Sequence, residues 1–454
     1  MNSSELFSEN LWKVSFPLRC FWYFVTPGET LYEKPEDVPD VISQIIPVFV
    51  VLIFIEALIC QFRGRFRFND ALVSLGNSNL LRVFEFIGEK HLPFLVYTYF
   101  FTYHRFYTFS WDSRTAWWLA FFMNDHGYYW EHRFLHETMV GWAAHQVHHS
   151  SQDFNLSTGI RQSLFQKFFS APFYIPMALL GIPPQMFMIH LGISLIYQFW
   201  IHTELIDGFG PVYNFFFNVP KHHQVHHGTN KFCIDKNYAG VLIIWDRIYG
   251  TFVEKNDHKD EKIAYGLLHG SESFSFSYIQ LRYYRFMVDE IKKHSSLKDK
   301  FRQVYIFMAK GPGYSEEKPN MRLGDIEDYP RGYPNYKIYD PYMSTKQSFY
   351  TLIQMLSASY LMSYFLERQS AYSEFDDEQK FSALSCVPVI IFLFHSTINI
   401  CQSCSGKDRK FEKSRLFLGV VIFCWLAFTL EDQQEALIKY VLTFVHLICL
   451  IFAK

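Results

Sequence analysis

The 454-residue chain carries 42 Lys and Arg against 44 Asp and Glu, and this near-balance argues against the basic surface of a nucleic-acid-binding protein. Half of its residues are hydrophobic and 19% are aromatic, whereas only 19% are charged, below the ~25% typical of soluble domains. Because the apolar residues come in blocks, the composition argues against a soluble protein and predicts an integral membrane protein.

The apolar blocks predict membrane-spanning helices, since a helix crosses the hydrocarbon core with about 20 mostly apolar residues. The candidate segments in chain order are Val41–Cys60, Pro93–Ser110, Thr115–Met123, Phe168–Leu180, Ile182–Trp200, Phe349–Leu366, Phe381–Ile400, Leu416–Leu430 and Ala436–Ala453. The fourth segment is short enough to be re-entrant. Gly181 and the prolines after it separate that segment from the next helix.

Basic residues between these segments predict their orientation. Three arginines between positions 63 and 67 follow the first segment, and a basic loop from Lys407 to Arg415 precedes the eighth. Because positively charged loops remain in the cytosol, both loops indicate one orientation. Counting segments from the first loop then places the histidine-rich stretches 132–149 and 202–227 on the cytosolic face.

The same pattern divides the chain into four parts. Residues 1–40 are expected to form an N-terminal segment on the non-cytosolic side, and residues 41–270 to combine membrane helices with a histidine-rich catalytic domain. Residues 271–345 are polar, end in a Gly-, Pro- and Tyr-rich stretch, and predict a cytosolic extension. Residues 346–454 are expected to form C-terminal transmembrane helices.

Nineteen histidines are present, and most of them lie between positions 126 and 227. They form one HxxxH motif and two HxxHH motifs, with further histidines beside them. The residues concerned are His132 and His136, then His145, His148 and His149, then His222, His223, His226 and His227, with His202 between the last two groups. On a helix, residues three or four positions apart lie on one face, so each motif presents imidazoles side by side.

These motifs must be distinguished from ordinary buried histidines. A single buried histidine is usually a hydrogen-bonded core residue, and we interpret isolated ones such as His190 in that way. Packed histidines differ, because without a metal their donors and acceptors are hard to satisfy and their protonated forms repel one another. The motifs therefore predict a metal site, while the roles of His126 and His222 stay open.

The number of imidazoles predicts two metals. A tetrahedral zinc takes about four ligands, so about eight or nine imidazoles suit two metals with four or five ligands each. Imidazole suits zinc, copper, iron or nickel and does not select among them. A site at the membrane surface beside apolar helices favours oxygen chemistry on a lipid chain. We therefore expect an all-α polytopic membrane bundle of about eight or nine segments with a cytosolic, histidine-rich di-metal cap.

Two carboxylates accompany the first motif. Glu131 precedes His132, and Glu137 directly follows His136. A carboxylate in such a position can bind the metal, orient a ligand imidazole or move a proton. The alternative for either residue is a solvated charge at a helix end.

Beyond the histidine motifs, the stretch Trp245–Phe252 reads WDRIYGTF. From about Asn124 to Phe252 the chain resembles the fatty acid hydroxylase superfamily of integral-membrane di-iron enzymes, whose closing signature is WDRxxGTF. Four stretches are similar to its alkylglycerol monooxygenase family: Tyr128–Arg133, His148–Ser163, Phe199–Glu204 and Asn218–His223. The chain length and the trailing hydrophobic segments are similar to that family as well.

The resemblance implies a specific reaction. Two iron ions and O₂ would hydroxylate the alkyl carbon next to the ether oxygen of an alkylglycerol or lyso-alkylglycerophospholipid, with tetrahydrobiopterin as electron donor. The product would collapse to a fatty aldehyde and a glycerol derivative. The implied location is the endoplasmic reticulum membrane, with the active site facing the cytosol. No pterin-binding motif is recognisable, so no residue is assigned to the pterin.

The resemblance also implies residue roles. The implied metal ligands are His132, His136, His145, His148, His149, His223, His226 and His227, with His202 as a ninth. His222 belongs to the third motif, as a ligand or a pterin contact. Glu137 occupies a position that is important for activity in the family, which implies a catalytic role.

Two alternatives remain at this point. A sterol or fatty acid hydroxylase or desaturase of the same superfamily would keep the histidine chemistry and change the substrate and the donor. A membrane metal transporter is a different class, and its ligands should lie near the middle of the membrane. The histidine motifs instead lie at predicted helix ends and in polar stretches, which favours an enzyme.

Overall fold

The computed structural model describes residues 15–87, 91–258, 260–268, 273–317, 338–369, 383–407, 412–428 and 433–452. Within these ranges the regular elements are helices, and an isolated bridge pairs Gly228 with Tyr265. The prediction of an all-α fold is therefore confirmed. The chain divides into two compact units, of which the first comprises 1–66, 89–271 and 282–338 and the second comprises 67–88, 272–281 and 339–454.

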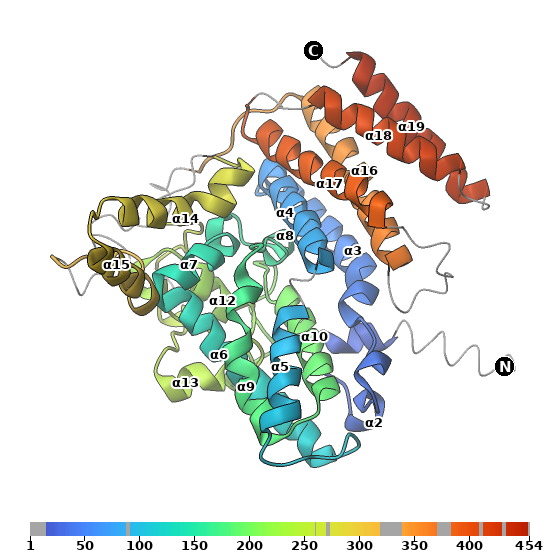
Figure 1. The fold of residues 1–454 in the computed structure, drawn as a ribbon. Coiled ribbons are helices and arrows are strands. Elements are labelled where there is room, and N and C mark those ends of the chain that lie inside the picture. Colours follow the sequence, from blue (N-terminus) through green and yellow to red (C-terminus); the bar gives the residue numbers. More distant parts are fainter. Residues whose placement is uncertain are drawn as a thin grey trace, which may run out of the picture. The chain divides into compact units, whose positions relative to one another are not determined.

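The first unit contains all the histidine motifs. Its helices are α2 (Pro27–Thr30), α3 (Val41–Phe62), α5 (His91–His104), α6 (Arg114–Glu137), α7 (Met139–His145), α8 (Leu156–Gly159), α9 (Ala171–Leu180), α10 (Pro184–Trp200), α11 (Pro211–Phe216), α12 (Pro220–His227), α13 (Ile244–Tyr249) and α15 (Leu297–Ala309). Helix α14 (Phe276–Lys292) enters this unit at Arg282. Helices α5, α6, α9 and α10 run beside one another, and α10 also packs on α3 (Figure 1).

Local sequence explains two breaks that shape this unit. The hydroxyl of Thr138 accepts a hydrogen bond from the amide of Gly141, which ends α6 and starts α7 in a new direction. Gly181 ends α9 with a φ of 90°, and a Cβ there would lie 1.8 Å from the carbonyl oxygen of Tyr107. Glycine is therefore required at position 181 for both its backbone conformation and its small volume.

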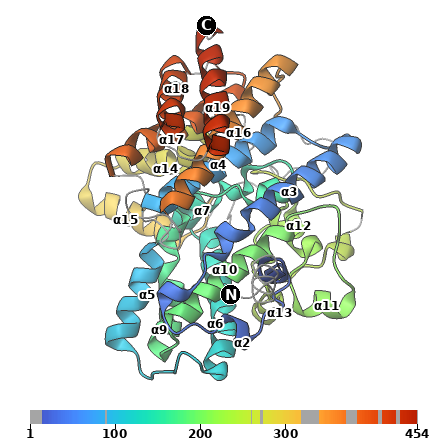
Figure 2. The same cartoon turned by 90° about the vertical axis from the view of Figure 1, so that its right-hand side faces the viewer.

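The second unit is built from α4 (Phe68–Ile87), α16 (Thr345–Gln369), α17 (Ala383–Cys404), α18 (Glu412–Phe428) and α19 (Gln433–Phe452). Helix α4 packs on α16 and α17, and α17, α18 and α19 pack in sequence order (Figure 2). Helix α4 is not among the segments expected from the sequence, which were identified as long apolar blocks. It buries Leu72, Val73 and Leu80, and Gly76 lies against Thr397 and Met355.

Two helices among the described residues are long and apolar enough to cross a membrane. They are Pro35–Phe62, which includes α3, and Cys386–Cys404, within α17. Two shorter apolar helices span Ala171–Leu180 and Ile438–Leu450. The polytopic membrane bundle of about eight or nine segments therefore stays a prediction beyond the confirmed helical fold.

Two sequence expectations change in detail. The predicted segment at 115–123 is the first part of α6, which is 24 residues long in total, and the polar residues of its second half are largely buried in the unit. Arg415 was interpreted as a basic loop residue, but it lies buried in α18. Its guanidinium is 3.0 Å from a carboxylate oxygen of Glu412 and donates to Gln354 at 2.7 Å. Arg415 therefore adds no solvated charge to that loop.

Candidate metal centre

The first histidine motif is carried by α6, which is fixed to the segment before α13. The carboxylate of Asp125 accepts hydrogen bonds from the amides of Val241 and Leu242 at 2.8 and 2.9 Å, and from the indole of Trp245 at 2.9 Å. These bonds anchor the middle of α6. His132 and His136 follow on the same helix, one turn apart and both buried.

The second and third motifs reach the same region from other elements. His145 is the last residue of α7, and His148 and His149 lie in the 3₁₀ turn that follows it. His223, His226 and His227 lie on α12, where Pro220 occupies the first turn and favours helix initiation. His202 follows the end of α10 and so reaches the same region from another helix.

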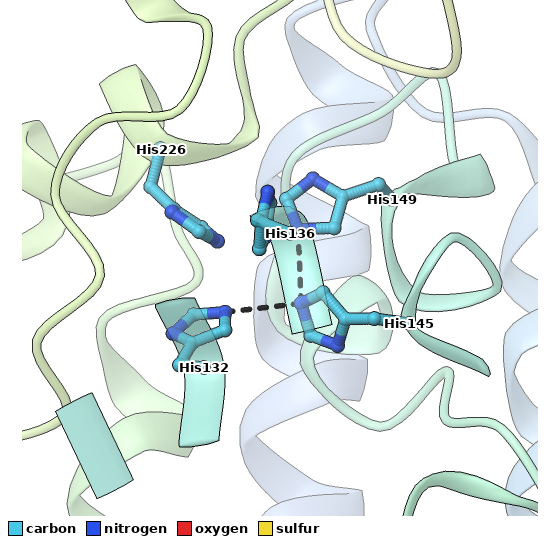
Figure 3. A group of neighbouring side chains, drawn as sticks. All are labelled: His132, His136, His145, His149 and His226. Atoms are coloured by element: carbon cyan, nitrogen blue, oxygen red, sulfur yellow. Dashed lines mark hydrogen bonds between the residues drawn. The ribbon is translucent and has the colours of Figure 1, made fainter. Parts of the chain in front are cut away.

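The structure gathers nine of these imidazoles into two buried groups. The first cluster consists of His132, His136, His145, His149 and His226, whose rings converge in Figure 3. The second cluster consists of His148, His202, His223 and His227. Within each cluster, one ring nitrogen of every member lies within 4.8 Å of those of the others. The spacing of the motifs thus predicted side chains that do meet in space.

Backbone carbonyls fix the orientation of four of these rings. The Nδ1 atoms of His132, His226, His148 and His202 lie 2.7, 2.9, 3.1 and 2.7 Å from the carbonyl oxygens of Tyr238, Lys236, Arg161 and Gln198 respectively. A carbonyl oxygen only accepts hydrogen bonds, so each Nδ1 carries the proton. The Nε2 atom of each neutral ring then carries no proton, and its lone pair can bind a metal.

These lone pairs point at one another at short distances. The Nε2 atoms of His132 and His145 are 3.0 Å apart, and Nδ1 of His145 faces the amide oxygen of Gln166 at 3.0 Å. In the second cluster, Nε2 of His202 lies 3.1 Å from Nε2 of His148. With their protons on Nδ1, neither pair can form a hydrogen bond through Nε2. A bound cation would convert this repulsion into coordination, so the donor set fits a metal in each cluster.

The electrostatics also favour metal binding. Burial, followed by the charge of neighbouring imidazoles, holds the pKa of His149 and of His227 well below the ordinary value. Burial lowers the pKa of His145 to about 4, and the hydrogen bond that its Nδ1 donates to the amide oxygen of Gln166 acts in the opposite direction. The imidazoles are therefore neutral near pH 7, which is the protonation state that a metal requires.

A short loop that the sequence analysis did not single out supports the first cluster. Asp235 and Asn237 adopt positive φ values of 57° and 55°, and between them Lys236 directs its carbonyl to His226. The side chain of Asn237 donates to the carbonyl of His222 at 3.0 Å and accepts from the amide of Val253 at 2.8 Å. Asp and Asn tolerate left-handed backbone, which was the available sequence signal.

His222 and His126 lie outside both clusters. His222 is buried on α12, with Nε2 3.6 Å from a carboxylate oxygen of Glu254 and its ring against Phe252. His126 is hydrogen-bonded to the hydroxyl of Tyr249 at 2.8 Å. The isolated His190 pairs with the hydroxyl of Tyr23 at 2.7 Å, as expected of a core histidine.

The two candidate carboxylates have different surroundings. Glu131 is buried, and its oxygens accept hydrogen bonds from the hydroxyls of Ser170 at 2.5 Å and Tyr174 at 3.0 Å. These bonds indicate a role in stabilising the fold. Glu137 ends α6 directly after His136 and remains partly exposed. Its Oε1 is 3.0 Å from Nε of Arg133 and 3.3 Å from the hydroxyl of Tyr238.

A cavity of about 530 Å³ opens onto the first cluster. His136, His149 and His226 of the first cluster line it, and the second cluster contributes His227. Its apolar walls include Met139, Trp142, Phe286 and Met287, and its polar lining includes Asp235, Arg282 and Tyr314. Volume and lining are those of a site for an amphiphilic small molecule. Part of the predicted extension, residues 282–314, therefore builds one wall of the histidine site.

Comparisons with known proteins agree with this site. Residues 117–251, which contain both clusters, match the fatty acid hydroxylase family. An alkylglycerol monooxygenase of Danio rerio is 40% identical over 344 residues, covering 75% of this chain and 74% of the relative. That of Homo sapiens is 39% identical over 344 residues, with the same two coverages of 75% and 74%.

A more distant relative, an ornithine lipid hydroxylase of Rhizobium tropici, is 30% identical over 135 residues, or 30% of this chain and 40% of its own length. No solved structure matches the chain. The extent and identity of the first two matches confirm the resemblance inferred from the motifs. Three histidine motifs, two imidazole clusters and these relatives lead to one conclusion: the chain is an oxidoreductase that belongs to the alkylglycerol monooxygenase family.

Proposed function

We propose that this protein is a di-iron monooxygenase that uses O₂ and tetrahydrobiopterin to hydroxylate the ether-adjacent alkyl carbon of alkylglycerols. The observation that carries the proposal is the pair of neutral imidazole clusters beside an amphiphilic cavity, in a chain 40% identical to an alkylglycerol monooxygenase. One oxygen atom enters the C–H bond, and the other leaves as water with two electrons and two protons from the donor. The hemiacetal then collapses to a fatty aldehyde and a glycerol derivative.

The proposed ligands are the five imidazoles of the first cluster and the four of the second. Bound iron would supply the activation of O₂ that no amino-acid side chain provides. His222 lies outside both clusters beside Glu254, so the proposed ligand set does not include it. No residue is proposed to bind tetrahydrobiopterin.

The chain's own residues would position the substrate and exclude water. Met139, Trp142 and Phe286 supply apolar surface for the alkyl chain in the cavity, close to His136 and His149. Removing that chain from water stabilises binding in proportion to the apolar area buried. Restricting its motion next to the first cluster favours reaction at one carbon.

Glu137 is proposed as the catalytic carboxylate that moves a proton near the first cluster. It follows His136 on α6, and contacts with Arg133 and Tyr238 hold its Oε1. A carboxylate that remains partly exposed can exchange protons with solvent, whereas the fully bonded Glu131 is poorly suited to do so.

We also propose that the protein spans the endoplasmic reticulum membrane several times, with the histidine clusters facing the cytosol. The apolar residues Val50, Phe54 and Leu58 of α3 are exposed in the structure, which supports a lipid-facing helix. In this proposal residues 1–40 are non-cytosolic, 41–270 form the membrane and catalytic part, 271–345 lie in the cytosol and 346–454 return to the membrane.

The test is an anaerobic metal count on the purified full chain, followed by addition of O₂ and an alkylglycerol with and without tetrahydrobiopterin. The expected result is about two iron ions per chain and pterin-dependent release of fatty aldehyde. Oxidation of a sterol or fatty acid without aldehyde from the ether lipid would instead identify a sister enzyme. Metal flux into vesicles without oxygen consumption would identify a transporter.

A further inference from the structure

The apolar helix α3 contains a single charged residue, Glu56, for which the proposed chemistry has no role. Its side chain is 4% exposed, so the carboxyl group is buried within the first unit. Burying a carboxyl group is unfavourable unless hydrogen bonds compensate for the lost hydration. The partners of Glu56 therefore indicate why a charge occurs in this helix.

Both oxygens of Glu56 accept hydrogen bonds from segments next to the second cluster. Oε2 accepts from the backbone amide of Leu156 at 2.6 Å, and Oε1 accepts from the hydroxyl of Thr203. Leu156 is the first residue of α8, and Thr203 directly follows His202. One carboxyl group thus connects two loops that are 47 residues apart in sequence.

The two loops meet at the imidazole of His202. A Cβ placed on Gly159, at the end of α8, would lie 3.0 Å from that ring, so α8 packs tightly against it. On the other side, the carbonyl of Thr203 accepts from the side-chain amide of Gln224 at 2.9 Å. Gln224 lies on α12 directly after His223. The contacts of Glu56 therefore extend through Thr203 to the helix that carries two other members of the second cluster.

We propose that Glu56 is a positioning residue for the second cluster, holding α8 and Thr203 so that Nε2 of His202 faces those of His148 and His223. The inference rests on the proposed two-metal centre. The first cluster is oriented by other groups, namely Gln166 and the carbonyls of Lys236 and Tyr238. Loss of Glu56 should therefore weaken one metal site and spare the other.

The experiment titrates the purified full chain with cobalt(II) under anaerobic conditions and measures bound metal and its visible absorption. In the Glu56→Leu variant, affinity at one site should fall by roughly 10- to 100-fold, as for other residues that orient ligands. The remaining absorption should match that of His202→Ala, which removes a second-cluster imidazole, and differ from that of His136→Ala. Retention of the first site also reports that the unit is folded.

Two conservative variants and a control sharpen the measurement. Thr203→Val removes the hydroxyl at similar volume and should lower cobalt affinity as much as Glu56→Leu does. Thr203→Ser keeps a hydroxyl and should bind cobalt nearly as the unchanged chain does. Leu58→Ala changes an exposed residue of the same helix and should bind cobalt as the unchanged chain does. In the Glu56→Leu/His202→Ala double variant, the losses should not add, because both changes act on one site.

The outcomes separate this inference from the function proposed above. If the unchanged chain binds fewer than two cobalt ions, the two-metal centre itself is wrong. If that chain binds two and Glu56→Leu also binds two with unchanged affinity, only the role of Glu56 is wrong. Equal weakening of both sites in Glu56→Leu would likewise overturn it, because a general structural role would not distinguish the clusters.

Discussion

The first histidine cluster contributes three imidazoles to the wall of the cavity, whereas the second contributes His227 alone. The first draws two imidazoles from α6, while the second takes none from that helix and uses His202 instead. The groups that orient the imidazoles differ as well: carbonyls of the loop 235–238 orient rings of the first cluster, whereas Glu56 and α8 are proposed to position the second. The first cluster therefore faces the cavity, whereas the second adjoins it through His227.

The largest effect should come from removing an imidazole between two others. Nε2 of His145 lies 3.0 and 3.2 Å from those of His132 and His149, so His145→Ala removes a central donor of the first cluster. We expect loss of aldehyde release beyond the roughly 100-fold effect of residues that only orient ligands. The control is His126→Gln, outside both clusters, which should keep both metals. Substantial turnover in His145→Ala would undo the ligand assignment.

The next effect concerns Glu137, the carboxylate that directly follows His136. Glu137→Ala should lower kcat by about 100-fold or more, the range expected for a lost proton-transfer group, with both metals still bound. Glu131→Gln is the matched comparison, because its carboxyl group is fully bonded to Ser170 and Tyr174. That variant should lower thermal stability more than kcat. A Glu137→Ala enzyme with unchanged kcat would remove Glu137 from the mechanism.

A third variant should mirror the expected effect of Glu56 at the other cluster. Asn237→Ala removes the side-chain bonds to the carbonyl of His222 and the amide of Val253 and disfavours the positive φ. The carbonyl of Lys236 should then misalign His226, lowering cobalt affinity at the first cluster by roughly 10-fold. Asn237→Asp tolerates the same backbone and should lose less. If Asn237→Ala instead lowered cobalt affinity only at the second cluster, the assignment of this loop to the first cluster would be wrong.

The smallest expected effect is a difference in KM between lipids with charged and neutral head groups. Arg282 lines the cavity, and a guanidinium binds phosphate more strongly than neutral hydroxyl groups. Arg282→Met should raise KM for a lyso-alkylglycerophospholipid by about 10-fold, the loss of one charged hydrogen bond, and change KM for a neutral alkylglycerol less. Initial rates with the two lipids measure this. Equal changes in KM for both lipids would exclude head-group recognition by Arg282.

The sequence predicted which imidazoles come together, but not how they divide between two clusters. His132 and His136 share one face of α6 and one cluster, as expected, whereas the members of each HxxHH motif divide between the two clusters. The direction of a carbonyl such as that of Lys236 was not predictable, because it has no residue signature and depends on neighbouring φ values. Asp235 and Asn237 signal only that left-handed backbone is tolerated there. Helix α4 was missed because polar residues such as Asn69, Asp70 and Asn77 interrupt its apolar residues, although these polar side chains are buried in the fold as well.

The use of main-chain carbonyls behind His132, His226, His148 and His202 has a consequence for protein engineering. Every residue type offers the same carbonyl, so side chains at 161, 198, 236 and 238 can be exchanged without removing the acceptor. A substitution at these positions can change the local backbone conformation, but it does not remove the carbonyl that accepts the hydrogen bond. Designs that transplant this centre must therefore reproduce loop geometry, because copying the histidines alone would leave their rings free to rotate.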